Sequence, residues 1–186
     1  RIGSKFLKSG PGFGGSCFQK DILNLVYLCG HYGLHQISDY WQQVVELNNW
    51  HQNRIAEKVV ENLFGTVTGK RIAIFGFAFK ADTNDTRESP AIRICNILLE
   101  EGAQLAIYDP KVTSVQIKKD LKIVEKFSEK KLIKKHFEFS KSCNDAALGS
   151  DAILILTEWE EFRNLNWKNL SSIMRKPSWL FDARRC

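Results

Sequence analysis

A glycine-rich segment near the start of the chain is the strongest candidate for a reactive site. Residues 10–21 read GPGFGGSCFQKD, with four glycines in six positions. Glycines let the backbone adopt conformations closed to other residues, and they let a ligand approach the main chain closely. A helical pattern begins directly afterwards, so Ser16 and Cys17 lie where free N–H groups and the helix dipole attract an anion. We therefore expect an anion-binding site beside Cys17.

Cys17 has the surroundings of a nucleophile. The helix N-terminus favours its thiolate form, and Lys20, one turn later, adds to that field. Asp21 lies four residues further on the same helical face, where it can activate a water beside the sulfur. This combination suits covalent thiol catalysis that ends with hydrolysis of a thioester, whereas the alternative is a buried structural cysteine behind a glycine turn. The other cysteines are expected to pack as small hydrophobic residues: Cys29, Cys95, Cys143 and Cys186.

The elements that must position these residues change in character along the chain. Apolar residues recur at helical spacing over residues 19–34 and again over 38–64, where Ser38 can cap the helix. Beyond them, short apolar runs alternate with helical segments, which is typical of a parallel sheet with helices on both faces. We predict an α/β fold, with a helical segment over about residues 1–66 and a Rossmann-like domain over about residues 67–186.

Several boundaries of this α/β part can be predicted from local signals. Ser89 and Pro90 supply an N-cap and a first helical residue, and Gly102 closes that helix. Residues 157–160 fit a capping box that opens a later helix. The predicted strands are residues 71–76, 105–110, 136–139, 152–156 and 179–181.

Ligands of parallel sheets bind at the carboxyl ends of the strands, where the loop of residues 76–88 lies. This loop lacks the G-x-G-x-x-G fingerprint of a dinucleotide site. Asp109 ends the second strand roughly where a ribose-binding acid would lie, but without the glycines a direct NAD site has little support. Lys80 and Arg87 are instead candidates for binding phosphates or sugar hydroxyls, with solvated loop charges as the alternative.

Composition excludes several other classes of protein. With 186 residues, 44% of them hydrophobic and only four prolines, the chain is not of the disordered or fibrous type. It has no apolar run near the roughly 20 residues of a membrane helix and no signal peptide, so we expect a cytoplasmic protein. The net charge of +6 resides in residues 111–141, where no arginine accompanies the lysines. We therefore expect a solvated surface rather than a nucleic-acid site, and no CxxC pair suggests a metal.

Taken in order, the motifs resemble those of the nucleotide-sugar 6-dehydrogenase family, and the phrase CFQKD favours its UDP-glucose branch. The resemblance spans essentially the whole chain in register. The residues that carry it are 12–21, 76–80, 85–89, 108–110, 157–159 and 181–185.

The resemblance implies a two-step oxidation in which NAD takes hydride twice from C6 of UDP-glucose to give UDP-glucuronate. Cys17 would attack the aldehyde and hold the thioester until water, assisted by Asp21, releases the product. The cofactor NAD would contact Cys17, Lys20 and Arg87. The implied substrate-binding residues are Arg1, Lys8, Ser9, Gly10, Gly12, Phe13, Gly14, Phe79, Lys80 and Arg184.

The resemblance also carries expectations about assembly. In the family, the residue matching Arg1 enters the substrate site of a neighbouring subunit, and the long central helix builds the dimer. We therefore expect a homodimer or higher homo-oligomer through residues 38–64.

One departure from the family is plain. Family enzymes begin with a domain that binds most of the NAD, and nothing in this sequence corresponds to it. Because the sequence starts inside a motif, we expect a C-terminal portion that binds UDP-sugars but alone reduces no NAD. Two alternatives stay open. One is a dehydrogenase for UDP-N-acetylmannosamine or GDP-mannose, and the other is a non-catalytic nucleotide-sugar-binding module with an unreactive Cys17.

Overall fold

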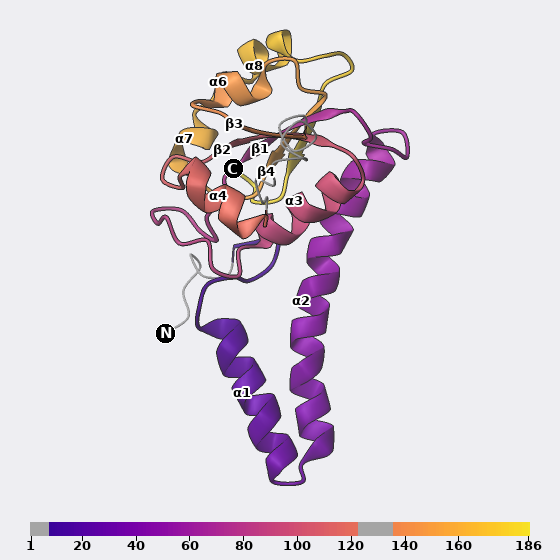
Figure 1. Ribbon diagram of the computed structural model, residues 1–186, viewed down its shortest axis with the longest axis vertical. Helices are drawn as coiled ribbons and strands as arrows, with labels where there is room; N and C mark the ends of the chain where they lie inside the picture. Colours follow the sequence, from indigo (N-terminus) through magenta and orange to yellow (C-terminus); the bar gives the residue numbers. More distant parts are fainter. Residues whose placement is uncertain (1–7, 123–135) are drawn as a thin grey trace, which may run out of the picture.

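The computed structural model describes residues 8–122 and 136–186, and it shows a protruding helical hairpin below an α/β body (Figure 1). Helices α1 (Phe18–His31) and α2 (His35–Asn62) form the hairpin. The predicted cap at Ser38 is wrong, because α2 begins three residues earlier and its N-cap, Leu34, makes no side-chain cap bond. The Ser38 hydroxyl instead donates to the carbonyl oxygen of Val26 at 2.9 Å and joins the two helices.

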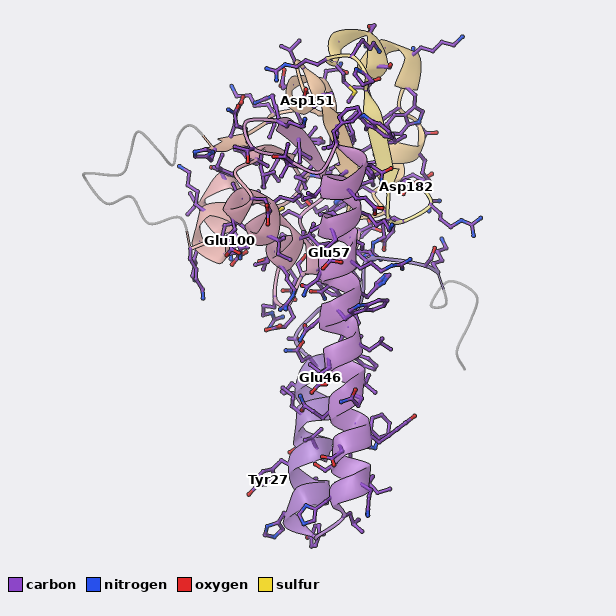
Figure 2. The ribbon with its side chains drawn as sticks, turned by 90° about the vertical axis from the view of Figure 1, so that its right-hand side faces the viewer. Tyr27, Glu46, Glu57, Glu100, Asp151 and Asp182 are labelled. Carbon is purple, nitrogen blue, oxygen red and sulfur yellow. The ribbon has the colours of Figure 1, made fainter. Side chains whose placement is uncertain are left out.

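Much of the hairpin surface is apolar and exposed. Tyr27 of α1 and Leu47 of α2 expose 69% and 63% of their surface. Figure 2 shows Tyr27 on the arm that projects from the body. Other large exposed apolar residues on the hairpin include Tyr32, Ile37, Tyr40 and Trp50. Several large apolar side chains exposed on one arm are typical of an interaction face.

The body is built on one parallel sheet of five strands, which confirms the predicted α/β class. Its strand order, β3-β2-β1-β4-β5, is that of the classic doubly wound dinucleotide-binding sheet without its sixth strand. Parallel pairing places the carboxyl ends of all strands at one edge. The strands are β1 (Arg71–Phe75), β2 (Gln104–Tyr108), β3 (Phe137–Phe139), β4 (Ala152–Ile155) and β5 (Trp179–Asp182).

The N-cap of one body helix agrees with the prediction, and that of another does not. Ser89 Oγ accepts a hydrogen bond from the Ala91 N–H at the start of α3 (Pro90–Glu100), as predicted. The capping box is wrong, because α7 (Glu160–Arg163) has Trp159 at its N-cap without a side-chain cap bond. The remaining body helices are α4 (Ser114–Asp120), α6 (Cys143–Ala147) and α8 (Trp167–Ile173).

The core lies between the sheet and its helices and includes the last third of α2. Ala56 and Val59 of α2 and its C-cap residue, Leu63, are almost fully buried and belong to the same hydrophobic cluster as β1 and β4. Helix α2 therefore belongs to the hairpin and also packs against the sheet of the body. The domain division near residue 66 stays a proposal. Of the lysine-rich stretch, residues 123–135 lie outside the described residues. A search of the described helices finds none with the length and hydropathy needed to cross a membrane.

Candidate functional site

A cavity of about 530 Å³ lies between the glycine-rich segment and the carboxyl edge of the sheet. Nine of the ten predicted substrate-binding residues line it, and the tenth, Arg1, lies outside the described residues. Whether these residues bind a ligand stays a prediction. The fold nevertheless brings residues more than 170 positions apart in the sequence into the lining of one cavity. The lining consists of Lys8, Ser9, Gly10, Gly12, Phe13, Gly14, Phe18, Phe79, Lys80, Glu158 and Arg184.

The charges of this lining suit a ligand with phosphates. Lys8 and Lys80 are exposed cations at the cavity, and the Lys80 ammonium lies 5.4 Å from the centre of the Phe79 ring. Ammonium groups and the open backbone of a glycine-rich segment are donors that phosphate oxygens accept. Phe13 and Phe18 meet edge to face at 4.7 Å and add an aromatic wall.

The Arg184 side chain is held in place by contacts within the protein. Its guanidinium Nε donates to the carbonyl oxygen of Leu156 at 2.9 Å, and its Nη2 donates to that of Phe79 at 3.0 Å. Glu158 Oε2 lies 3.1 Å from Nε, and both side chains are largely buried. Burial lowers the pKa of Arg184, while the Glu158 carboxylate acts in the opposite direction. Sequence reasoning did not single out Glu158 as a site residue.

The position of Arg184 explains why residue 10 is a glycine. A Cβ on Gly10 would lie 2.6 Å from Nη1 of Arg184, so a side chain at this position would collide with the guanidinium. The glycine-rich segment and the C-terminal arginine therefore approach each other as closely as the backbone allows.

Helix α2 holds the glycine-rich segment from below. The buried Asn48 accepts a hydrogen bond from the Phe13 N–H at 2.9 Å and donates one to the Phe13 carbonyl oxygen at 3.2 Å. Nε2 of His51 lies 3.2 Å from the carbonyl oxygen of Gly10. Sequence reasoning missed both residues, which lie within the predicted apolar helix of residues 38–64. A carboxamide within an apolar stripe is the signal that could have found Asn48.

Cys17 lies at the start of α1, next to this cavity, and it is exposed. Its sulfur is 3.6 Å from Ser16 Oγ. Its exposure contradicts the alternative of a buried structural cysteine. Cys29, Cys95 and Cys143 are buried, and Cys186 is half-buried.

Asp21 lies one helical turn after Cys17, and its N–H donates to the Cys17 carbonyl oxygen at 2.9 Å. Its carboxylate is mostly exposed and lies 3.6 Å from the Lys20 ammonium. All three predicted side chains of this turn are therefore accessible from solvent, as a reaction with an incoming ligand requires.

Arg87 lies beside the cysteine loop. Its carbonyl oxygen accepts the Gly15 N–H at 2.9 Å. The guanidinium forms a fork with Asp85, with distances of 3.0 Å to Oδ1 and 2.7 Å to Oδ2. These hydrogen bonds raise the pKa of Arg87, and negative charge on nearby Cys17 contributes in the same direction. The same fork lowers the pKa of Asp85.

Asp109 does not occupy a free ribose-binding position. It is 3% exposed, and its Oδ2 accepts hydrogen bonds from the N–H groups of Phe77 at 2.7 Å and Ala78 at 3.0 Å. The indole N–H of Trp159 donates to the same oxygen at 3.2 Å. Two further backbone N–H groups, those of residues 111 and 112, donate to Oδ1. Asp109 therefore organises the loops at the carboxyl edge of the sheet and has little capacity left for a ligand.

Replacing Asp109 by asparagine is expected to lower the free energy of unfolding by about 2–3 kcal/mol, because an NH₂ group would face N–H donors in a buried site. Urea unfolding measures this difference. Asp39→Asn on the exposed surface of α2 is the matched control and should change stability by less than about 0.5 kcal/mol. An unchanged midpoint for Asp109→Asn would contradict the structural role.

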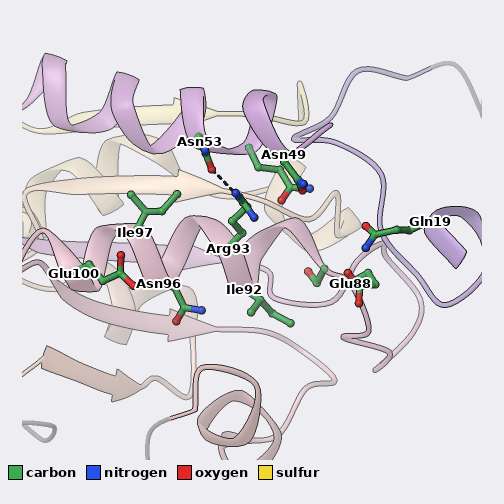
Figure 3. A pocket seen from close by; sticks show the side chains of 11 residues that line it. Gln19, Asn49, Asn53, Glu88, Ile92, Arg93, Asn96, Ile97 and Glu100 are labelled. Carbon is green, nitrogen blue, oxygen red and sulfur yellow. Dashed lines mark hydrogen bonds between the residues drawn. The ribbon is translucent and has the colours of Figure 1, made fainter. Parts of the chain in front are cut away.

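A second cavity, of about 610 Å³, lies between α2 and α3 (Figure 3). Its lining is rich in carboxamides, and Arg93 Nε donates to Asn53 Oδ1 across it at 2.7 Å. None of the predicted site residues lines this cavity. The carboxamides of the lining belong to Gln19, Asn49, Gln52, Asn53 and Asn96.

Known proteins resemble the chain in both of its parts. Residues 73–186 match the UDP binding domain of the UDP-glucose/GDP-mannose dehydrogenase family, and residues 1–50 match the central domain of the same family. The UDP-glucose 6-dehydrogenase of Drosophila melanogaster is 49% identical over 100% of this chain and 39% of that protein. The UDP-glucose 6-dehydrogenase of Caenorhabditis elegans is 50% identical over 99% of this chain and 38% of that protein. The chain thus spans well under half of the length of these relatives.

A solved structure agrees with the sequence matches. A UDP-glucose dehydrogenase from the archaeon Pyrobaculum islandicum superimposes with a TM-score of 0.72 and 26% identity, covering 99% of this chain and 37% of that one. The match to the UDP binding domain alone extends over more than half of the residues, and the chain therefore belongs to the UDP-glucose/GDP-mannose dehydrogenase family.

Proposed function

We propose that this chain supplies the UDP-glucose site and the catalytic cysteine of a UDP-glucose 6-dehydrogenase. The observation that carries this proposal is the position of Cys17, exposed at the first turn of α1 beside a cavity lined by three cations and a glycine-rich backbone. A nucleotide sugar needs phosphate donors and a wall for its rings, and the oxidised carbon must reach a nucleophile. The cavity and Cys17 together meet these needs.

In this proposal the diphosphate contacts Lys8 and the backbone of residues 9–14. Phe79 and Lys80 contact the glucosyl end, and Arg184 contacts the nucleotide sugar through a guanidinium held by the protein. A preformed arginine costs less conformational entropy on binding than a free side chain does.

The proposed reaction uses the Cys17 sulfur as a covalent nucleophile. Oxidation of the C6 alcohol gives an aldehyde, which the Cys17 thiolate attacks to form a thiohemiacetal. Loss of a second hydride from C6, together with the proton of the adduct's hydroxyl group, converts this adduct to a thioester. Water then attacks the thioester with help from Asp21, so that the carbon–sulfur bond breaks and the carboxylate and thiolate are released. NAD⁺, when bound, would supply the oxidising power by accepting the two hydrides, one for each molecule of cofactor.

The residues around Cys17 fit a dinucleotide better than the edge of the sheet does. Lys20 and the forked Arg87 present exposed cations on the cysteine side, where dinucleotide phosphates would find donors. Asp109, in contrast, already accepts five hydrogen bonds from the protein. We propose that Cys17, Lys20 and Arg87 contact NAD, most of which would be bound by a domain that is not part of this sequence.

We further propose a cytoplasmic homo-oligomer in which a second copy covers the hairpin. The exposed aromatic and aliphatic residues of α1 and α2 support this, because an arm with so much apolar surface gains stability when another surface buries it.

The proposal is tested by alkylating the chain with iodoacetamide at neutral pH, with and without UDP-glucose. We expect Cys17 to react first and UDP-glucose to slow its reaction by about tenfold or more, because the bound sugar would cover the sulfur. The chain's own buried thiols serve as controls, since burial raises the pKa of Cys143 to about 12 and that of Cys95 still further.

An inert Cys17 would favour the non-catalytic module instead. If GDP-mannose or UDP-N-acetylmannosamine protects Cys17 from alkylation and UDP-glucose does not, the result would favour the dehydrogenase for the protecting sugar nucleotide. We also expect no NADH from the chain alone with UDP-glucose, and measurable NADH would contradict the proposed division of labour.

A further inference from the structure

We propose that Asn48 is the positioning residue of the substrate cavity, and that it acts through the peptide of Phe13. The inference rests on the proposed function, because it assigns a residue outside the cavity lining to the binding of the UDP-sugar. Asn48 lies on α2, thirty-five residues from Phe13 in the sequence, and it is 6% exposed.

The contact between the two residues is reciprocal. One carboxamide accepts the Phe13 N–H at 2.9 Å and donates to the Phe13 carbonyl oxygen at 3.2 Å. Both polar groups of this peptide segment are thereby satisfied by a single side chain, as they would be by a neighbouring strand. A residue without a carboxamide would leave a poorly hydrated donor and acceptor, and the loop would have to move to find other partners.

The flanking glycines show how closely the loop is held. A Cβ on Gly12, whose φ is +123°, would lie 2.5 Å from Asn48 Oδ1. A Cβ on Gly14 would collide with the carbonyl oxygen of Glu88 on the other side. The Phe13 peptide is thus clamped between α2 and the segment that precedes α3, and only glycine neighbours permit the clamp.

The clamp determines where the cavity wall lies. The Phe13 ring meets the Phe18 ring edge to face at 4.7 Å, and both rings line the cavity. Phe18 directly follows Cys17 and is the first residue of α1. A displacement of the Phe13 peptide would therefore shift the aromatic wall and the first turn of the helix that carries the sulfur.

The test measures the affinity for UDP of Asn48→Ala, Phe13→Ala and the double variant, by calorimetry well below all unfolding midpoints. Asn48→Ala is expected to weaken binding by about tenfold, which corresponds to the loss of roughly one buried hydrogen bond. If Asn48 acts by placing the Phe13 ring in the cavity wall, the double variant binds UDP no more weakly than Phe13→Ala alone, because Phe13→Ala keeps the backbone groups that Asn48 bonds and removes only the ring. A purely structural Asn48 would leave the affinity of the folded protein unchanged.

Asn53→Ala is the matched control, because Asn53 lies on the same helix but bonds Arg93 in the second cavity (Figure 3). It is expected to bind UDP like the wild type. Additive losses in the double variant, or equal losses in Asn53→Ala and Asn48→Ala, would overturn the inference.

A wild-type chain that does not bind UDP would contradict the proposed function rather than this inference. The position of the loop is then measured by the alkylation rate of Cys17. That rate must differ by at least about threefold between Asn48→Ala and both the wild type and Asn53→Ala for the inference to stand.

Discussion

Replacing Cys17 by serine is expected to lower the formation of UDP-glucuronate by at least about 10³-fold, because removal of a covalent nucleophile removes the intermediate that divides the reaction into two steps. A serine hydroxyl at the same place is far less ionised than a thiol, so it attacks the aldehyde poorly. Affinity for UDP should change by less than about threefold, since the sulfur lies beside the cavity and does not line it.

The measurement compares turnover with binding. Turnover is followed as NADH production by the chain joined to the N-terminal region of the Drosophila melanogaster relative, because we expect the chain alone to be inactive. Cys29→Ser is a poor control because Cys29 is buried, whereas Cys186→Ser alters a half-buried thiol at the chain end and should retain activity. Unchanged turnover in Cys17→Ser would exclude the thioester route.

The class of the fold was predictable because strands and helices leave different periods in a sequence. The α/β body, its five strands and the Ser89 cap agree with the structure, since each depends on residues that are close in sequence. The errors arose where a distant partner competed for a side chain. Ser38 bonds Val26 across the hairpin, and Thr157 donates to the Ala78 carbonyl oxygen instead of capping a helix. A capping signal in the local sequence contains no information about hydrogen-bond partners that are distant in the sequence.

The lining of the candidate site follows the prediction to a similar extent and for a similar reason. The cysteine loop is a continuous motif, so the proposed anion-binding turn and the proposed nucleophile depend on neighbouring residues. Two supporting residues could not be inferred in this way, because their partners are distant in sequence. Asn48 bonds Phe13 of the loop, and Glu158 pairs with Arg184 of the cavity lining. Asp109 shows a role that its position alone did not reveal. It ends a strand roughly where a ribose-binding acid would lie, a site that the missing glycines already made poorly supported, and five protein donors converge on it once the chain folds.

Arg184→Leu is expected to weaken the binding of UDP by about 100-fold and to lower the free energy of unfolding by about 3 kcal/mol. Both effects follow from the same bonds. The substitution removes the donors to Leu156 and Phe79, and it leaves the Glu158 carboxylate largely buried without its cation. A buried charge that loses its partner costs more than the pair had contributed.

The neighbouring arginine offers a matched control. Arg185→Leu removes the same charge one residue later, from a side chain that does not line the cavity, and should change stability by less than about 0.5 kcal/mol. Isothermal calorimetry with UDP and urea unfolding distinguish the two variants.

Arg184→Lys separates charge from geometry. A lysine keeps the positive charge beside Glu158, but its single ammonium cannot reproduce the planar fork that reaches two carbonyl oxygens at once. We expect this variant to recover much of the stability and little of the affinity, because the charge satisfies Glu158 whereas the ligand meets a group in a different place. Wild-type affinity in Arg184→Lys would show that charge alone is sufficient, and the preformed orientation of the guanidinium would then have no role in binding.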